Sequence, residues 1–161
     1  MTEFQLNGKR VSAGLRPGTT LFDYLRDQGY FSVKYGSDKS ETGSDSVLVD
    51  GNIMNASLML IHTVHGKNIE TVESFASGMD LHPLQDAFIE EGAIQCGYCT
   101  PGMILAIESL ALEKDFPTEE DVRDTLAGVY CRCTGYVKPV NAAKIYLDAE
   151  KSRHELHERN K

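Results

Sequence analysis

The placement of the four cysteines constrains this chain more than any other feature. All of them lie beyond residue 95, in two tight pairs: Cys96-x-x-Cys99 and Cys131-x-Cys133. Gly97 within the first pair, with Gly102 and Gly135 shortly after the two pairs, allows the backbone to curl, so that neighbouring sulfurs converge and amide groups face them. Unrelated buried cysteines would not fall into two glycine-flanked pairs. The pattern therefore favours a metal site.

Two kinds of metal site fit four thiolates. They can hold one Zn²⁺ ion in a tetrahedron or a [2Fe–2S] cluster, and the spacing alone does not decide between them. The Cys-x-Cys half weakens the case for zinc, because the commoner zinc knuckles use longer spacings. A reducing compartment disfavours disulfides between these cysteines.

Composition excludes several classes of partner. The 161 residues include 24 acidic and 16 basic side chains, giving a net charge of −8, and no stretch gathers Lys and Arg with aromatics. We therefore expect no nucleic-acid partner. No apolar run approaches the roughly 20 residues that span a bilayer, and the N-terminus does not resemble a secretory signal. The sequence predicts a cytoplasmic protein without a membrane segment.

The first half of the chain has the pattern of a small mixed sheet crossed by a helix. Residues 4–13 predict a β-hairpin around Asn7-Gly8, and residues 17–29 predict a helix capped by Thr19 or Thr20. Residues 46–54 predict two strands joined by Asp50-Gly51, followed by a short helix over residues 57–66 and a strand over 68–73.

From residue 81 onward the pattern is helical. Pro83 and Pro101 suit first helical positions, and Thr118 with Asp121 resembles a capping box. The small polar stretch 75–80 separates the two patterns. We therefore predict an α+β chain with three parts: a sheet domain over 1–74, a linker over 75–80 and a helical domain over 81–161 that ends in a polar tail.

The cysteine segments also carry a family resemblance. "QCGYCTPGMI" and "CRCTGY" resemble the helical iron–sulfur domain of the molybdenum hydroxylase family, which includes xanthine dehydrogenase, aldehyde oxidoreductase and carbon monoxide dehydrogenase. "VKYG", "VLVDG" and "TVESFA" resemble the N-terminal domain of the same family, a β-grasp fold like plant-type ferredoxin. The resemblance covers the chain up to about residue 150 and identifies it with the small iron–sulfur subunit.

The resemblance implies specific roles. Cys96, Cys99, Cys131 and Cys133 would ligate a [2Fe–2S] cluster, while Gln95 and Cys133 would lie near the molybdopterin of a partner subunit. The partners implied are a large molybdopterin-binding subunit and a flavin subunit that carries FAD. The chain would carry electrons for an oxidoreductase of the xanthine dehydrogenase type and hold no catalytic residue or substrate site of its own.

The polar loop between residues 34 and 51 departs from the family pattern. The family holds a second [2Fe–2S] cluster there with the spacing Cys-x₄-Cys-x₂-Cys and a later fourth cysteine. In this chain those positions are occupied by other residues: Ser37, Thr42, Asp45 and Ser57. Hydroxyl and carboxylate oxygens are hard ligands, whereas such a cluster is held by soft thiolates. We therefore predict one cluster per chain.

Three functions remain open at this point. The first is electron transfer from the molybdenum cofactor through a single [2Fe–2S] cluster. The second is a mainly structural, docking role within the same complex, with the cluster stabilising the helical half. The third is a zinc-bound interaction module that uses the four cysteines.

Overall fold

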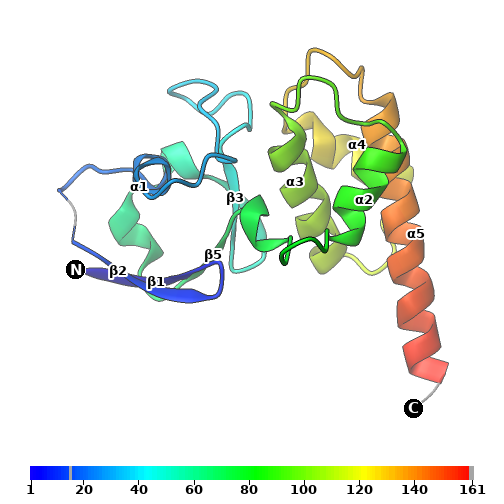
Figure 1. Cartoon of the computed structure of the whole chain (residues 1–161), viewed down its shortest axis with the longest axis horizontal. Helices are drawn as coiled ribbons and strands as arrows, with labels where there is room; N and C mark the ends of the chain where they lie inside the picture. The colour runs from blue at the N-terminus through cyan, green and yellow to red at the C-terminus, as the bar shows by residue number, and fades with distance from the viewer. Residues whose placement is uncertain (15, 160–161) are drawn as a thin grey trace.

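A computed structural model describes residues 1–14 and 16–159, and the side chains of residues 15 and 153–161 lie outside this description. Two lobes lie side by side in Figure 1, a sheet lobe that carries the N-terminus and a helical lobe that carries the C-terminus. The sheet lobe contains these strands and helix: β1 (Thr2–Leu6), β2 (Lys9–Ala13), α1 (Leu21–Asp27), β3 (Ser46–Val49), β4 (Asn52–Asn55) and β5 (Asn68–Glu70).

The sheet has the strand order β2-β1-β5-β3-β4. β1 and β5 are parallel and the other neighbouring strands are antiparallel. Two tight turns set the hairpin registers: Asn7 and Gly8 have φ values of 49° and 75°, and Asp50 and Gly51 have 51° and 81°. These values are those of type I′ turns, which match the twist of the strands they join.

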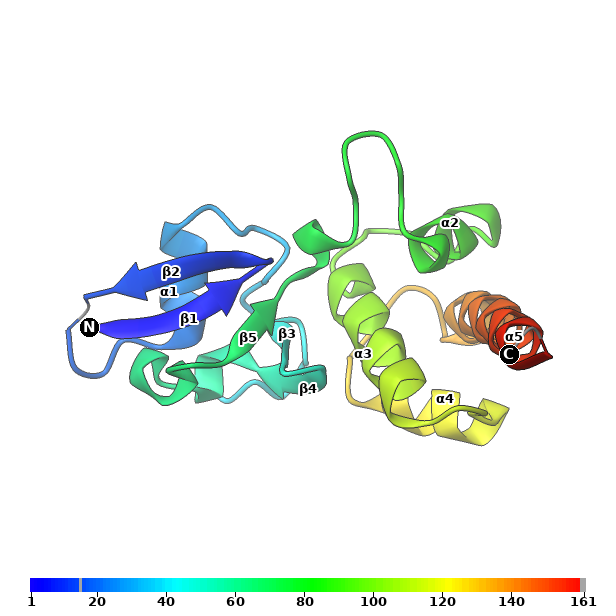
Figure 2. The ribbon, with the colours of Figure 1, turned by 90° about the horizontal axis from the view of Figure 1, so that it is seen from below.

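Helix α1 covers one face of the sheet (Figure 2). Thr20 is its N-cap and forms a reciprocal capping box with Asp23. Leu21 and Leu25, one turn apart, are completely buried in the sheet lobe's core. Burial of one such side chain contributes about 2 kcal/mol. The predicted α+β class and the β-grasp arrangement are confirmed.

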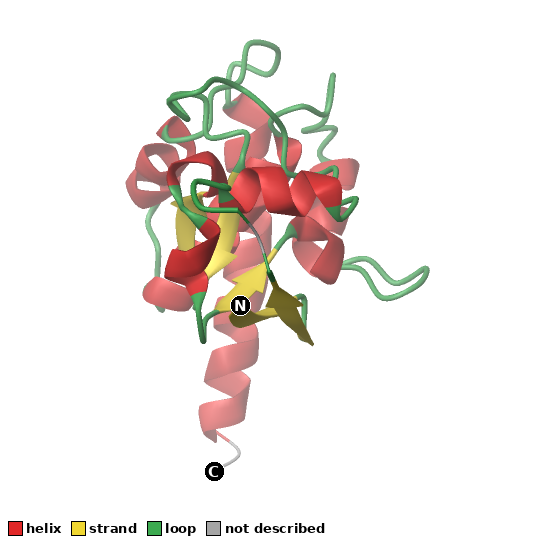
Figure 3. Ribbon diagram, turned by 90° about the vertical axis from the view of Figure 1, so that its left-hand side faces the viewer, coloured by secondary structure: helices red, strands yellow, loops and turns green. Residues whose placement is uncertain are grey.

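The helical lobe has four helices: α2 (Pro83–Glu90), α3 (Thr100–Glu113), α4 (Glu119–Ala127) and α5 (Val137–Arg159). Pro83 begins α2 and Pro101 lies in the first turn of α3, as their sequence positions predict. α3 is the central element, because most of its side chains are buried. Figure 3 shows α5 extending away from the end of the molecule at which the loops gather.

The two lobes have separate core clusters, and α3 joins them. Ser109 on α3 accepts a hydrogen bond from the Ile53 amide at 3.1 Å and donates one to the Gly51 carbonyl at 3.0 Å. Val72 and Phe75 pack against the helical core, so the chain already contacts the helical lobe before α2 begins. Two cores support the predicted division at residues 75–80, which stays a prediction.

Two predicted elements differ in the structure: the short helix over residues 57–66, and the strand over 68–73, which ends at Glu70. Residues 57–66 do not form a single short helix but two 3₁₀ turns, η1 (Ala56–Leu58) and η2 (Ile61–Val64), and a third turn, η3 (Val72–Ser74), follows β5. Ala56, Ile61 and Val64 are buried, at spacings that serve two separate turns better than one α-helical face. Between η3 and α2 the chain forms a loop that projects from the molecule (Figure 2). Two backbone hydrogen bonds between Ser77 and Asp80 close this loop.

In the described part of the chain, no helix has the length and apolar character needed to cross a bilayer.

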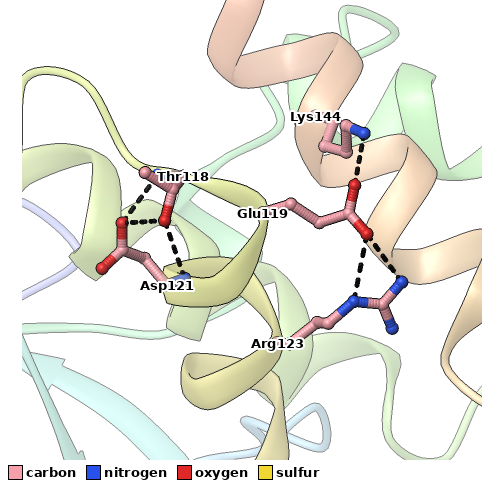
Figure 4. Close-up of polar contacts among 5 residues, drawn as sticks. All are labelled: Thr118, Glu119, Asp121, Arg123 and Lys144. Atoms are coloured by element: carbon pink, nitrogen blue, oxygen red, sulfur yellow. Dashed lines mark hydrogen bonds and ion pairs between the residues drawn. The ribbon is translucent and has the colours of Figure 1, made fainter.

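The start of α4 offers a test of local stability. Thr118 accepts a hydrogen bond from the Asp121 amide at 3.2 Å, and Asp121 accepts bonds from the Thr118 amide and hydroxyl, both at 2.6 Å (Figure 4). Beside this box, Glu119 pairs with Arg123 and with Lys144 of α5.

We expect Thr118→Ala to lower the free energy of unfolding by about 1 kcal/mol at pH 7 in chemical denaturation. The exposed variant Glu120→Gln should have almost no effect.

The capping box of Thr118 and Asp121 also makes the free energy of unfolding depend on pH. The hydrogen bond to Lys114, then those from Thr118, lower the pKa of Asp121. As pH falls, the Asp121 carboxylate therefore takes up a proton in the unfolded chain before it does so in the folded protein. The stability that this carboxylate contributes is lost as pH falls below the ordinary Asp range of about 4. We expect the difference between wild type and Thr118→Ala to shrink between pH 5 and pH 2 in thermal melts. A difference that stays constant over that range would contradict this account.

Candidate metal centre

Two connections between helices bring the cysteines together. Cys96 and Cys99 lie between α2 and α3, and Cys99 is the N-cap residue of α3. Cys131 and Cys133 lie between α4 and α5. Figure 1 shows these two connections next to each other at the same end of the helices. Gly97, with φ of 80°, has a left-handed conformation that glycine adopts without strain.

The four sulfurs form two pairs. The Sγ atoms of Cys96 and Cys133 are 3.6 Å apart, although 37 positions separate them in the chain. Cys99 and Cys131 also interact through their side chains. The second pair is buried and the first is exposed. Four thiols arranged as two pairs fit a [2Fe–2S] cluster, which the four thiolates would hold. Among the residues described, no three Cys, His, Asp or Glu side chains lie close enough together to hold a single metal ion.

The two buried thiols differ in acidity. Burial, and then the hydrogen bond with Cys131, raise the pKa of Cys99 to about 12. Burial also acts to raise the pKa of Cys131, but hydrogen bonds from Thr134 and from the Cys133 amide outweigh it, so that this pKa is lowered. The Thr134 hydroxyl lies 3.1 Å from the Cys131 sulfur and its amide 3.5 Å. These donors favour a thiolate, the form that binds metal.

A tyrosine fixes the Cys131 segment. The Tyr136 hydroxyl accepts a hydrogen bond from the Cys131 amide at 2.8 Å and donates one to the Val129 carbonyl at 3.2 Å. Tyr136 itself has a positive φ of 65°. Its side chain thus closes the loop that carries two of the four sulfurs.

We expect Tyr136→Phe to lower the free energy of unfolding by about 1 to 3 kcal/mol, because the Cys131 amide and the Val129 carbonyl, which belong to buried residues, lose their shared partner. Chemical denaturation measures this change. Tyr130→Phe is the matched control, since its hydroxyl accepts a hydrogen bond from the exposed Arg132 at 3.2 Å and its loss should cost less than about 0.5 kcal/mol. Equal losses in both variants would show that the Tyr136 bonds are not specific.

The polar loop of the sheet lobe lies against this centre. A cavity of about 310 Å³ is lined by three of the loop's side chains and by all four cysteines, together with aromatic and basic neighbours: Tyr35, Thr42, Ser44, Cys96, Tyr98, Cys99, Tyr130, Cys131, Arg132 and Cys133. The Tyr98 hydroxyl donates to the Tyr35 carbonyl, and the Tyr130 amide donates to the Thr42 carbonyl at 2.9 Å. The loop therefore contacts both cysteine segments.

Close backbone packing holds the loop there. Gly43 has φ of 62°, and a Cβ atom at that position would lie 2.2 Å from the Gly128 carbonyl oxygen. A Cβ atom on Gly102 of α3 would lie 2.7 Å from the Gly43 carbonyl oxygen. Only hydrogen fits at either place, so these glycines allow the loop backbone to approach α3 and the end of α4.

The structure brings only two of the four residues at the predicted second-cluster positions into contact with each other. Asp45 accepts a hydrogen bond from the Ser57 hydroxyl at 2.5 Å. Ser37 instead accepts one from the Glu41 amide at 3.0 Å, and the Thr42 hydroxyl lies 3.0 Å from that of Ser44. The third and fourth positions therefore touch, whereas the first two have other partners.

The comparisons with known proteins agree with this geometry. A family model described as "[2Fe-2S] binding domain" matches residues 71–144, which contain all four cysteines. The xanthine dehydrogenase iron-sulfur-binding subunit of Escherichia coli O157:H7 is 42% identical over 153 residues, covering 94% of this chain and 94% of that protein. The chain belongs to the molybdenum hydroxylase family of iron–sulfur subunits.

Other members of the family show the same correspondence. The nicotinate dehydrogenase small FeS subunit of Eubacterium barkeri is 40% identical, over 88% of this chain and 90% of that subunit. In the crystal structure of quinoline 2-oxidoreductase from Pseudomonas putida 86, a chain superposes with a TM-score of 0.87 at 34% identity, covering 94% and 95% of the two chains. Aldehyde oxidoreductase from Desulfovibrio gigas gives 0.89, but there the match covers 17% of a longer chain.

Sequence reasoning missed the residues that connect the two lobes at this centre. Tyr35, Tyr98 and Tyr130 line the cavity, but no local pattern shows that Tyr35 of the sheet lobe meets the two tyrosines beside the cysteines. Ser40 has φ of 57° and a buried side chain within the polar loop. A serine in a glycine-like conformation could not be recognised from one sequence.

Proposed function

We propose that this subunit transfers electrons within a molybdopterin-dependent hydroxylase complex, with Cys96, Cys99, Cys131 and Cys133 as ligands of one [2Fe–2S] cluster. The observation that carries the proposal is the pairing of the four thiols across two loops, 3.6 Å apart in the exposed pair. When bound, the cluster would accept and release single electrons. The chain's own residues hold the thiolates, donate hydrogen bonds to them and limit their contact with water.

The exposed thiol pair marks the side from which electrons would enter. Cys96 and Cys133 are exposed, as is Gln95, whereas Cys99 and Cys131 are buried against the helical core. We therefore place Gln95 and Cys133 at the molybdopterin of a large partner subunit. Four free thiols suit a reducing compartment, and we accordingly assign the complex to the cytoplasm.

The second part of the proposal concerns the loop of the sheet lobe. Ser37, Thr42, Asp45 and Ser57 supply only oxygen ligands, which are poorly suited to an iron–sulfur cluster. We infer that this loop holds no cluster and that electrons leave directly from the single cluster. A flavin subunit that carries FAD would then have to accept from that cluster, or a different acceptor would replace it.

Metal analysis of the purified complex tests the proposal. We expect about two iron and two labile sulfide per copy of this chain, with the visible absorption of one [2Fe–2S] cluster. About four of each would overturn the single-cluster inference while leaving electron transfer intact. One zinc per chain, no labile sulfide and no visible absorption would overturn the electron-transfer proposal itself.

A further inference from the structure

A buried carboxylate lies at the centre of the polar loop. Asp45 is 2% exposed, and its Oδ2 atom accepts hydrogen bonds from the Ser57 amide at 2.8 Å, from the Ser57 hydroxyl at 2.5 Å and from the Ser40 hydroxyl. The Ser40 and Ser57 hydroxyl oxygens are also 2.8 Å apart. A buried carboxylate with this many donors is a strong and specific anchor, because charge-assisted bonds are stronger in a poorly solvated site.

The anchor ties the loop to the chain after β4. Beyond the side-chain bonds, the Ala56 amide donates to the Asp45 carbonyl at 3.1 Å, and the Asn55 side chain donates to the Ser40 carbonyl at 3.0 Å. Two segments separated by a dozen residues are thus joined at both backbone and side-chain level. Two neighbouring residues of the same loop face the helical lobe: the Thr42 carbonyl accepts the Tyr130 amide, and the Gly43 backbone packs against Gly128 and Gly102.

We propose that Asp45 is a positioning residue that holds this loop over the cysteine site and thereby limits the exposure of the bound [2Fe–2S] cluster to water. The inference rests on the proposed function for the four cysteines. Asp45 acts at a distance: it fixes residues 40–45, and the Thr42 carbonyl then receives the Tyr130 amide, next to Cys131. Because solvent exposure and nearby hydrogen bonds set the potential of a cluster, Asp45 would influence the redox step without touching the iron.

Three variants of the full chain, each purified in its complex, test this role. Asp45→Ala removes the acceptor, and Asp45→Asn keeps one acceptor oxygen. Ser37→Ala is the matched control, since Ser37 is in the same loop but its hydroxyl accepts a hydrogen bond from the exposed Glu41 amide instead. Each protein is analysed for iron and sulfide, for the rate at which a ferrous chelator removes iron and for the midpoint potential of the cluster.

We expect Asp45→Ala to lose iron to the chelator about tenfold faster than wild type, because loss of bonds to a buried charged group makes opening of the loop more frequent. Its midpoint potential should shift, Asp45→Asn should recover most of both properties, and Ser37→Ala should match wild type. An Asp45→Ala protein that retains wild-type iron, extraction rate and potential would overturn the proposal.

A second measurement keeps the test independent of the cluster. Hydrogen exchange at the Tyr130 amide, which is bonded to the Thr42 carbonyl, reports opening of the loop with or without iron. We expect faster exchange in Asp45→Ala, and in Ser57→Ala if the first variant does not fold. Unchanged exchange would refute the positioning role. If the wild-type protein contained no iron or sulfide, but the Tyr130 amide still exchanged faster in Asp45→Ala than in wild type, the proposed function alone would be refuted.

Discussion

Cys99→Ser should eliminate the visible absorption of the [2Fe–2S] cluster and reduce bound iron from about two atoms per chain to almost none. Cys99 is buried beside Cys131, and this burial, followed by the hydrogen bond with Cys131, raises the pKa of its thiol to about 12. A serine alkoxide at this position would be harder still to form, and oxygen is a poorer ligand for iron in such a cluster than sulfur. Iron analysis and absorption spectra of the purified complex measure the loss.

The control for this variant is Met103→Leu, a volume-conserving change of a buried residue one turn further along α3. It should keep its iron and its substrate-driven turnover. Turnover distinguishes electron transfer from a structural role. If the Cys99→Ser complex assembles, lacks iron and still turns over at the wild-type rate, the cluster is structural and the electron-transfer proposal is wrong.

Gly43→Ala should lower the free energy of unfolding by about 3 kcal/mol, the sum of a left-handed backbone cost and overpacking. The added methyl group would lie 2.2 Å from the Gly128 carbonyl oxygen, which is backbone and cannot rotate away. The loop must then move away from the helical lobe, and the Tyr130 to Thr42 hydrogen bond should weaken with it. Chemical denaturation measures the first effect, and hydrogen exchange at Tyr130 measures the second.

Gly78→Ala is the control that separates the cost of the left-handed backbone from the cost of the steric contact at Gly43. Gly78 has φ of 65°, close to the 62° of Gly43, but a Cβ atom there would meet no atom within 4 Å. Its substitution should therefore cost only the left-handed term of about 1 kcal/mol. If both variants lose the same stability, the approach of Gly43 to Gly128 is not a tight contact and the account of how the lobes dock fails.

Local chemistry explains which parts of the fold were predictable. Asn7-Gly8 and Asp50-Gly51 fix their turns within two residues, and Thr118 with Asp121 fixes a helix start within four. The region over residues 57–66 was predicted wrongly because its apolar spacing suits either one helix or two 3₁₀ turns. Contacts with the rest of the sheet lobe decide between these, and they are not visible in a local pattern.

The sequence by itself determined that four thiols would lie in two short loops with glycines, since Cys-x-x-Cys and Cys-x-Cys are short-range patterns typical of metal ligation. It also determined that Ser37, Thr42, Asp45 and Ser57 carry oxygen rather than sulfur. Tertiary structure alone decided that Cys96 pairs with Cys133, that Asp45 binds Ser57 and that the polar loop packs on the cysteine site through Gly43. Those contacts join residues 12 to 85 positions apart, and only the packing of whole elements brings such residues together.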